Sequence, residues 1–163
     1  MSTTEKIYKL LVAIRIRGNV GVRRSIKDTL GILRLFKVNH AVLLDNRKSN
    51  KGMLQKAKDY ITWGQIDKDT LVHLLMKRGK LPGNKSLNDE HIKKYTKYKS
   101  IQELAEALIK FELQLKDVPY LKPVFRLHPP RKGFKFKKKR PYKDVGELGN
   151  RDIEINPLLS RMI

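Results

Sequence analysis

The pattern of apolar and polar positions near the start of the chain predicts a strand, a tight turn and a helix. Every second residue over residues 10–16 is a large aliphatic residue, which is typical of a half-buried strand. A turn with two glycines follows, and residues 25–36 carry apolar residues at helical spacing. Ser25 with Asp28 matches a capping box, which predicts that the helix begins there.

Two further apolar runs predict two more strands. Residues 39–45 and 60–66 are rich in apolar, β-branched or aromatic residues and are bounded by turn formers. A polar, basic loop over residues 45–52 and a short helix over residues 53–59 are expected between them. The order strand, helix, strand, helix, strand over residues 1–66 predicts an α+β unit. Three strands with two helices on one face are its simplest closed packing.

The following region, residues 67–123, is expected to be mainly helical. One helix is predicted at its start, a short one over residues 86–94, and the clearest one over residues 101–115. In the last of these, apolar residues recur every three or four positions, and Ser100 with Glu103 forms a capping pair before it. This apolar stripe predicts a face turned to the core, with a groove for a partner helix as the alternative.

The third region, residues 124–163, contains the densest run of positive charge. A short extended segment over residues 124–127 precedes a basic block, residues 131–143. Prolines and a glycine within and before the block argue against a helix, so an extended arm is predicted that would be disordered or extended alone. The apolar residues of the C-terminal segment, residues 149–163, predict that the end of the chain docks on the body.

The net charge of the chain restricts the possible functions more than any sequence motif does. The chain has 37 Lys and Arg against 16 Asp and Glu, a net charge of +21 and a pI near 10.2. Such a charge repels itself in the folded state, so a polyanion is expected as the partner. Nucleic acid is the best match, because phosphate neutralisation releases counterions and drives binding.

Other classes are disfavoured by what the sequence lacks. Without cysteine, disulfide scaffolds, Cys-ligated metals and thiol catalysis are excluded, and the four histidines show no metal-ligand spacing. No metal, cofactor or catalytic residue is therefore assigned. No signal peptide or membrane-spanning run is found, so a cytoplasmic protein without a membrane partner is expected.

Three basic segments are the candidate RNA contacts. The turn over residues 15–24 holds four arginines and no acidic residue, and it lacks the GxxxxGK[ST] and GxGxxG signatures of nucleotide sites. In the block over residues 131–143, aromatic residues interleaved with lysines suit base stacking. The alternative for the turn is a solvated edge of the domain. The alternative for the block is a solubilising or targeting tail. The predicted contacts are Arg15, Arg17, Gly18, Asn19, Gly21, Arg23 and Arg24 in the turn, Arg47, Lys48, Lys51 and Gly52 in the loop over residues 45–52, and Arg131, Lys132, Phe134, Lys135, Phe136, Lys137, Lys138, Lys139 and Arg140 in the block.

Short segments along nearly the whole chain resemble one known family. They are Arg17-Gly18, residues 30–35, 38–43, 51–53, 60–64, 77–79 and 124–127, Pro129-Pro130 with the lysine-rich run after them, and residues 149–162. Their order and spacing resemble the large-subunit ribosomal protein thirty family, in the longer form called protein seven in eukaryotes. The absence of the long basic N-terminal extension of eukaryotic members favours the archaeal form.

This resemblance implies a fold, a role and partners. The implied fold is α+β, with a three-stranded antiparallel sheet and helices on one face. The implied role is that of a structural constituent of the large ribosomal subunit that binds large-subunit rRNA near the 5S rRNA region, beside neighbouring ribosomal proteins. The family brings no catalytic residue or cofactor, and no homo-oligomer is expected.

The mechanism expected from the residues is a two-point clamp on RNA. The arginine turn would hold phosphates at one point, and the basic arm would enter between RNA helices at the other. Contacts should be mainly with backbone and shape, because A-form RNA exposes phosphates and 2′-hydroxyls more than readable base edges. The alternatives are a non-ribosomal RNA-binding module in RNA processing, a nuclease, and a protein that binds membrane surfaces.

Overall fold

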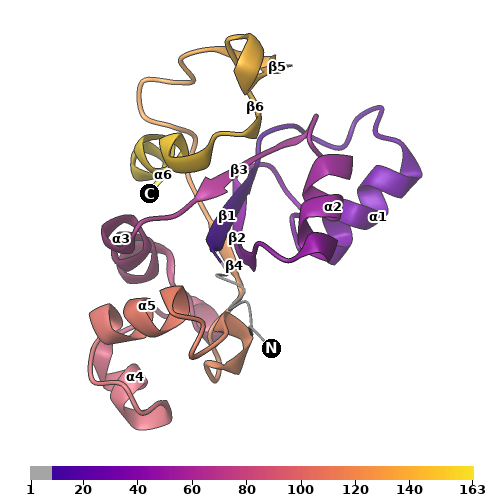
Figure 1. The fold of residues 1–163 in the computed structure, drawn as a ribbon. Helices are drawn as coiled ribbons and strands as arrows, with labels where there is room; N and C mark the ends of the chain where they lie inside the picture. Colours follow the sequence, from indigo (N-terminus) through magenta and orange to yellow (C-terminus); the bar gives the residue numbers. More distant parts are fainter. Residues whose placement is uncertain (1–8) are drawn as a thin grey trace, which may run out of the picture.

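The strand predicted at residues 10–16 lies in the interior of a six-stranded mixed sheet. The computed structural model describes residues 9–163, and the strand order is β4-β2-β1-β3-β6-β5 (Figure 1). The strands are β1 (Leu10–Arg15), β2 (His40–Asp45), β3 (Ile61–Gln65), β4 (Val124–Arg126), β5 (Lys137–Pro141) and β6 (Gly146–Asn150). Residues 1–8 of the predicted N-terminal unit lie outside the described residues.

The helices lie between or after these strands and have eleven residues or fewer. They are α1 (Arg24–Ile32), α2 (Lys48–Lys56), α3 (Lys68–Arg78), α4 (Asp89–Tyr95), α5 (Ile101–Ile109) and α6 (Ile155–Met162). Short 3-10 turns lie at Pro82–Asn84, Leu115–Asp117, Tyr142–Asp144 and Asp152–Glu154. Within residues 9–163, no helix is long and apolar enough to span a membrane.

The three predicted strands of the first unit form an antiparallel core. β1 pairs with β2 on one side and with β3 on the other, so that Ala13 lies opposite both Val42 and Trp63. The predicted order of strands and helices in this unit is confirmed. Leu30 of α1 and Leu54 of α2 belong to the buried cluster on one face of these strands.

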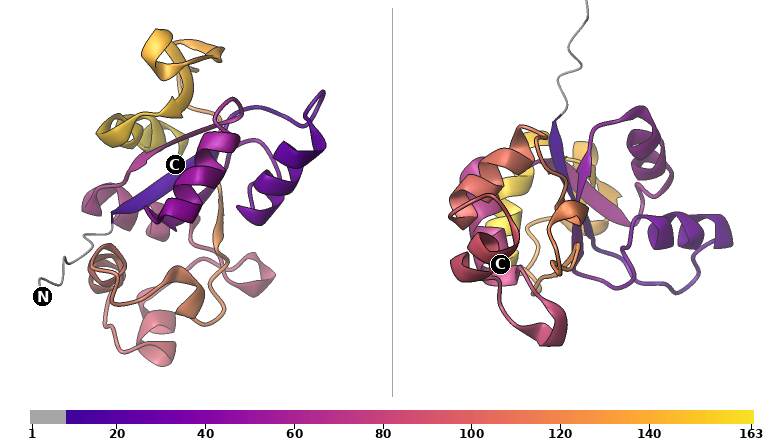
Figure 2. Two further views of the ribbon diagram at one scale, coloured as in Figure 1. Left: turned by 45° about the vertical axis from the view of Figure 1, so that its right-hand side comes forward. Right: turned by 90° about the horizontal axis from the view of Figure 1, so that it is seen from below.

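Helices cover both faces of the sheet, which differs from the expected single face. Val12 and Ile14 of β1 belong to a second buried cluster, with side chains from α3, α5 and α6. Seen from below, the strands lie between α1 and α2 on one side and the remaining helices on the other (Figure 2). The second layer comes from the later part of the chain. These later helices cover the period-two apolar face of β1, whereas α1 and α2 pack on the opposite face, which holds Ala13; the period-two pattern reports only the first of these faces.

The last third of the chain extends the same sheet. β4, predicted as a short extended segment, pairs antiparallel with β2, whereas β6 pairs parallel with β3 and β5 parallel with β6. Leu159 and Met162 of α6 are completely buried, so the C-terminal segment docks as its apolar residues predict.

The helix α1 differs from its prediction at both ends. It begins at Arg24, and no side chain caps it, so the capping box predicted from Ser25 and Asp28 is wrong. It ends before Arg34, whose φ of 60° is left-handed and cannot continue a helix.

The other helices keep the predicted order with shifted boundaries. α2 begins at Lys48, inside the segment predicted as a loop, so basic residues of that segment lie on a helix. The capping residue Ser100 is confirmed, because its hydroxyl accepts from the amide of Glu103 at 3.3 Å. α5 ends earlier than predicted, since Phe111 takes a φ of 58°.

Gly64 marks the closest approach between the sheet and the C-terminal segment. A Cβ atom at this position would overlap the carbonyl oxygen of Asp152 and lie 2.9 Å from Cβ of Ile155. The absence of a side chain on β3 therefore allows α6 and the turn before it to pack on the sheet.

Replacing Gly64 by Ala should lower the free energy of unfolding by roughly 1–3 kcal/mol, because the added methyl overpacks this contact. Gly31→Ala is the matched control, since a Cβ atom there meets nothing within 4 Å and Gly31 lies inside α1. That control should gain about 0.5–1 kcal/mol from helix propensity. Urea unfolding followed by circular dichroism measures both; equal effects of the two substitutions would contradict the packing argument.

Candidate nucleic-acid interface

The loop between β1 and α1, residues 16–23, is here called the arginine loop. Two amides at its start donate to the carbonyl oxygen of Tyr60, at 3.0 and 3.1 Å. Its tip is solvated, with Val20 98 % exposed. Gly21 takes a φ of 68°, which glycine adopts at little cost. The loop therefore has an anchored base and an exposed tip.

Arg15, predicted as an RNA contact, is instead a buried structural residue that is 2 % exposed. Its Nη1 donates to the carbonyls of Leu35 and Phe36 at 2.7 and 3.1 Å, and its Nε donates to that of Arg17 at 2.8 Å. Its Nη2 donates to the side chain of Asn19, which is thereby engaged as well. Burial lowers the pKa of Arg15. This burial argues against an RNA contact of Arg15, because the arginine loop and the segment after α1 enclose its guanidinium.

Three other arginines of this region place their guanidinium groups at the surface, partly or fully exposed to solvent. Arg17 donates to the carbonyl of Asp59 at 3.0 Å, and its guanidinium lies 4.9 Å from the ring centroid of Tyr60. A carbonyl does not neutralise a cation, so the charge persists. Arg23 and Arg24 are exposed at the start of α1, whose first turn holds no acidic residue. The positive end of the helix dipole adds to their attraction for anions.

The second predicted basic segment lies on α2. Lys48, Lys51 and Gly52 are exposed, whereas Arg47 forms an ion pair with Asp45 at 2.9 Å. Asp45 pairs with Leu10, the first residue of β1, whereas the arginine loop follows the last residue of β1. The start of α2 and the arginine loop therefore lie at opposite ends of β1.

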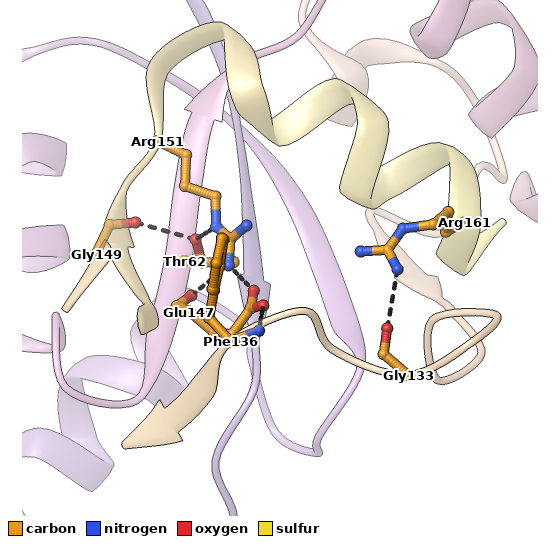
Figure 3. Close-up of polar contacts among 7 residues, drawn as sticks. All are labelled: Thr62, Gly133, Phe136, Glu147, Gly149, Arg151 and Arg161. Carbon is orange, nitrogen blue, oxygen red and sulfur yellow. Dashed lines mark hydrogen bonds and ion pairs between the residues drawn. The ribbon is translucent and has the colours of Figure 1, made fainter. Parts of the chain in front are cut away.

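The basic block at residues 131–143, here called the basic arm, folds back on the body. Its strand β5 pairs with β6, and the amide of Phe136 donates to the Glu147 carboxylate at 2.8 Å. Arg161 of α6 donates to the carbonyl of Gly133 at 2.9 Å (Figure 3). The backbone is extended as predicted for β5, but it has partners within the protein, which charge density alone did not indicate.

A buried arginine anchors the arm to the sheet (Figure 3). Nε of Arg151 donates to the hydroxyl of Thr62 at 2.9 Å, and Nη2 donates to the carbonyl and the carboxylate of Glu147. Its guanidinium also lies 4.8 Å from the ring centroid of Tyr142. Burial lowers the pKa of Arg151 to about 10, so it remains a cation at neutral pH.

The outer side of the arm presents the predicted cations to solvent. Every residue of β5 is exposed, as are Arg131, Lys132 and Lys135. Phe136 is exposed as well, whereas Phe134 is half-buried, with the ammonium of Lys138 at 4.7 Å from its ring centroid. Of the two predicted stacking residues, Phe136 is therefore the more accessible.

A groove of about 780 Å³ runs between α2 and the end of the basic arm. We call it the lysine groove, since its lining includes Lys9, Lys51, Lys58 and Lys143 against the acidic residues Asp59 and Asp152. Trp63 and Tyr142 add aromatic surface to the lining. Asp59 is also the carbonyl partner of Arg17, so the arginine loop adjoins this groove.

Several groove residues were not predicted from the sequence. Lys51 lies on α2 and Lys58 in the turn just after its end, and both line the groove. This placement was missed because residues 45–52 were assigned to a loop. Trp63 was assigned only to a strand, and its role in the groove depends on the arm that folds beside it. Among residues 9–163, no group of three or more His, Asp or Glu side chains could hold a metal ion.

Replacing Glu147 by Gln should loosen the basic arm, because the variant keeps the shape but leaves the buried Arg151 without its counter-charge. Breaking a buried ion pair in this way costs about 3–5 kcal/mol. Hydrogen–deuterium exchange should become faster in peptides covering residues 134–141, and the urea midpoint should fall. Glu112→Gln, at an exposed acid after α5, is the control. Unchanged exchange in the arm would show that Glu147 does not anchor it.

Known proteins resemble this chain over most of its length. The family described as ribosomal protein L30p/L7e matches residues 11–61. Large ribosomal subunit protein uL30 of Methanopyrus kandleri is 51% identical over 149 residues, which cover 91% of this chain and 100% of the relative. The protein of the same name from Staphylothermus marinus is 51% identical over 159 residues, covering 94% of this chain and 98% of the relative. The chain therefore belongs to the ribosomal protein L30p/L7e family, the family of large ribosomal subunit protein uL30.

Proposed function

We propose that the chain is a structural, non-catalytic constituent of the large ribosomal subunit that binds large-subunit rRNA. The observation that carries this proposal is its identity of about half to relatives named large ribosomal subunit protein uL30, over 91% or more of this chain. The surface agrees with a polyanionic partner, because most basic side chains lie outside the core and the net charge is +21.

The structure suggests how the RNA is held. The lysine groove lies between the basic arm and α2, and the arginine loop adjoins it at Asp59. A phosphate backbone in this groove would be neutralised from both walls, and each contact would release counterions. We therefore keep the proposal of a two-point clamp formed by the arginine loop and the basic arm, and we add the lysine groove as a third contact surface between them. The contacts we propose are Arg17, Arg23, Arg24, Lys48, Lys51, Lys58 and Lys143, with the exposed cations of the arm.

The finer partners are also proposals. The 5S rRNA region and neighbouring ribosomal proteins are proposed because the family resemblance implies them. We propose no homo-oligomer and no cofactor. A non-ribosomal RNA-binding protein of the same fold is the second candidate, favoured only by the general basicity of the surface.

Co-sedimentation separates the two candidates. A tagged chain, expressed in an archaeal host, should remain with 50S particles that are pelleted through sucrose after a high-salt wash. Recovery only in the free fractions would favour the non-ribosomal candidate and count against a structural ribosomal role.

The salt dependence of rRNA binding tests the arginine loop. The double substitution Arg23→Ala with Arg24→Ala should weaken binding to large-subunit rRNA and lower the slope of log K against log salt by about one unit per lost phosphate contact. Filter binding over a series of salt concentrations measures the slope. Lys110→Ala with Lys116→Ala removes the same charge from the exposed end of α5 and the segment after it. That control should keep the slope; an unchanged slope in the arginine variant would mean that neither side chain touches phosphate.

A further inference from the structure

A cluster of three aromatic rings lies at α4, far from the lysine groove. Two of the rings belong to α4, and the third comes from the segment before β4. The ring centroid of Tyr95 lies 4.7 Å from that of His91 and 5.3 Å from that of Tyr120, and the last pair meets edge to face. We call these three residues the tyrosine platform. Figure 1 shows α4 at the end of the molecule away from β5. The basic surfaces described above therefore do not include this cluster.

The platform is solvent-facing and does not belong to the core. Tyr120 is 62 % exposed and Tyr95 is 41 % exposed, and neither packs in the buried clusters, whereas the neighbouring Tyr98 does. Two large rings that remain this exposed leave aromatic surface available for contact with a partner.

The backbone holds Tyr120 in place at a cost. Its φ of 62° is left-handed, a conformation that a bulky residue rarely adopts. The turn is fixed on both sides of it, because Val118 and Leu121 are buried and the amide of Lys122 donates to the carbonyl of Lys80 at 2.9 Å. Tertiary contacts therefore hold the backbone of Tyr120 in an unfavourable conformation and fix the position of its exposed ring.

Lysines lie beside Tyr95 along the chain, whereas the acidic residues of α4, Asp89 and Glu90, lie in its first turn. Residues 93–99 contain four lysines and no acidic residue. The ammonium group of Lys94 lies 5.4 Å from the ring centroid of Tyr95. Rings bordered by cations complement a nucleotide, whose base stacks on the rings while its phosphates meet the ammonium groups.

We propose that the tyrosine platform binds an unstacked base of single-stranded or looped large-subunit rRNA, by stacking on the exposed ring of Tyr120, which Tyr95 supports edge to face, with lysines of residues 93–99 holding the adjoining phosphates. This inference rests on the proposed function and adds a second, separate RNA site to it. Single-stranded loops are the RNA elements whose bases are free to stack on aromatic side chains.

The test uses the full chain bound to protein-free large-subunit rRNA. Irradiation at short ultraviolet wavelength followed by mass spectrometry should find an RNA cross-link on Tyr120 or Tyr95. Tyr120→Leu should weaken filter binding by about 5- to 100-fold, the range for one lost stacked base, without changing the salt slope. Tyr120→Phe keeps the ring and should bind like the parent chain.

Two further variants control for folding and for general loss of aromatic surface. Tyr120→Gly removes the ring and relaxes the left-handed backbone, so it should lose affinity while its thermal midpoint stays equal or rises. Phe36→Leu removes an aromatic residue that is 56 % exposed in the segment between α1 and β2. This control should change the affinity by less than about two-fold, because the contact of Phe36 with Arg15 is made by its main-chain carbonyl, which the substitution keeps.

The outcomes distinguish this inference from the proposed function. If Tyr120→Leu and Tyr120→Gly bind like the parent chain while the Arg23 and Arg24 variant binds weakly, the platform proposal is overturned and the rRNA-binding function stands. If the parent chain does not bind rRNA at all, both fail. Protection of Tyr120 from iodination only after other ribosomal proteins are added would assign the platform to a protein partner and overturn the RNA site.

Discussion

Two buried guanidinium groups hold the basic surfaces of this protein to its sheet. Arg15 connects β1 to the arginine loop and to the carbonyl of Leu35, and Arg151 connects β3 to β6 through Thr62 and Glu147. A guanidinium has five donors in a planar fork, so one side chain can join several segments. Burying such a cation is costly unless its donors are satisfied, which fixes the geometry of the loops that supply the acceptors.

This use of arginine separates the structural cations from the cations that we propose to bind RNA. A chain with a net charge of +21 cannot place many cations in its core. Arg15 and Arg151 are buried with partners, and other basic side chains of the arginine loop and the basic arm remain on the surface. Because the arginine loop and the basic arm are anchored within the protein itself, less conformational entropy would have to be lost in the proposed binding. The lysine groove depends on the same anchor, since Tyr142 in its wall lies against Arg151.

Local patterns predicted the elements well where one residue or one period decides the structure. The strands at residues 39–45 and 60–66 and the cap at Ser100 follow from apolar runs and a single hydroxyl. Predictions that required long-range partners were less successful. The extra layer over β1 and the anchored arm both depend on segments far apart in the chain, which periodicity does not report.

The sequence by itself determined the charge balance, the absence of cysteine chemistry, the α+β order of elements and the family resemblance, because each depends on residue type or local spacing. Only the tertiary structure decided that Arg15 is buried while Arg23 is exposed. The reason is that carbonyl acceptors for the Arg15 guanidinium come from residues 35 and 36, which are distant in the chain. It also decided that Lys58 and Lys143 share a groove and that Tyr95 meets Tyr120. Whether a basic or aromatic side chain binds a partner depends on its neighbours in space, and those neighbours are set by packing between distant segments.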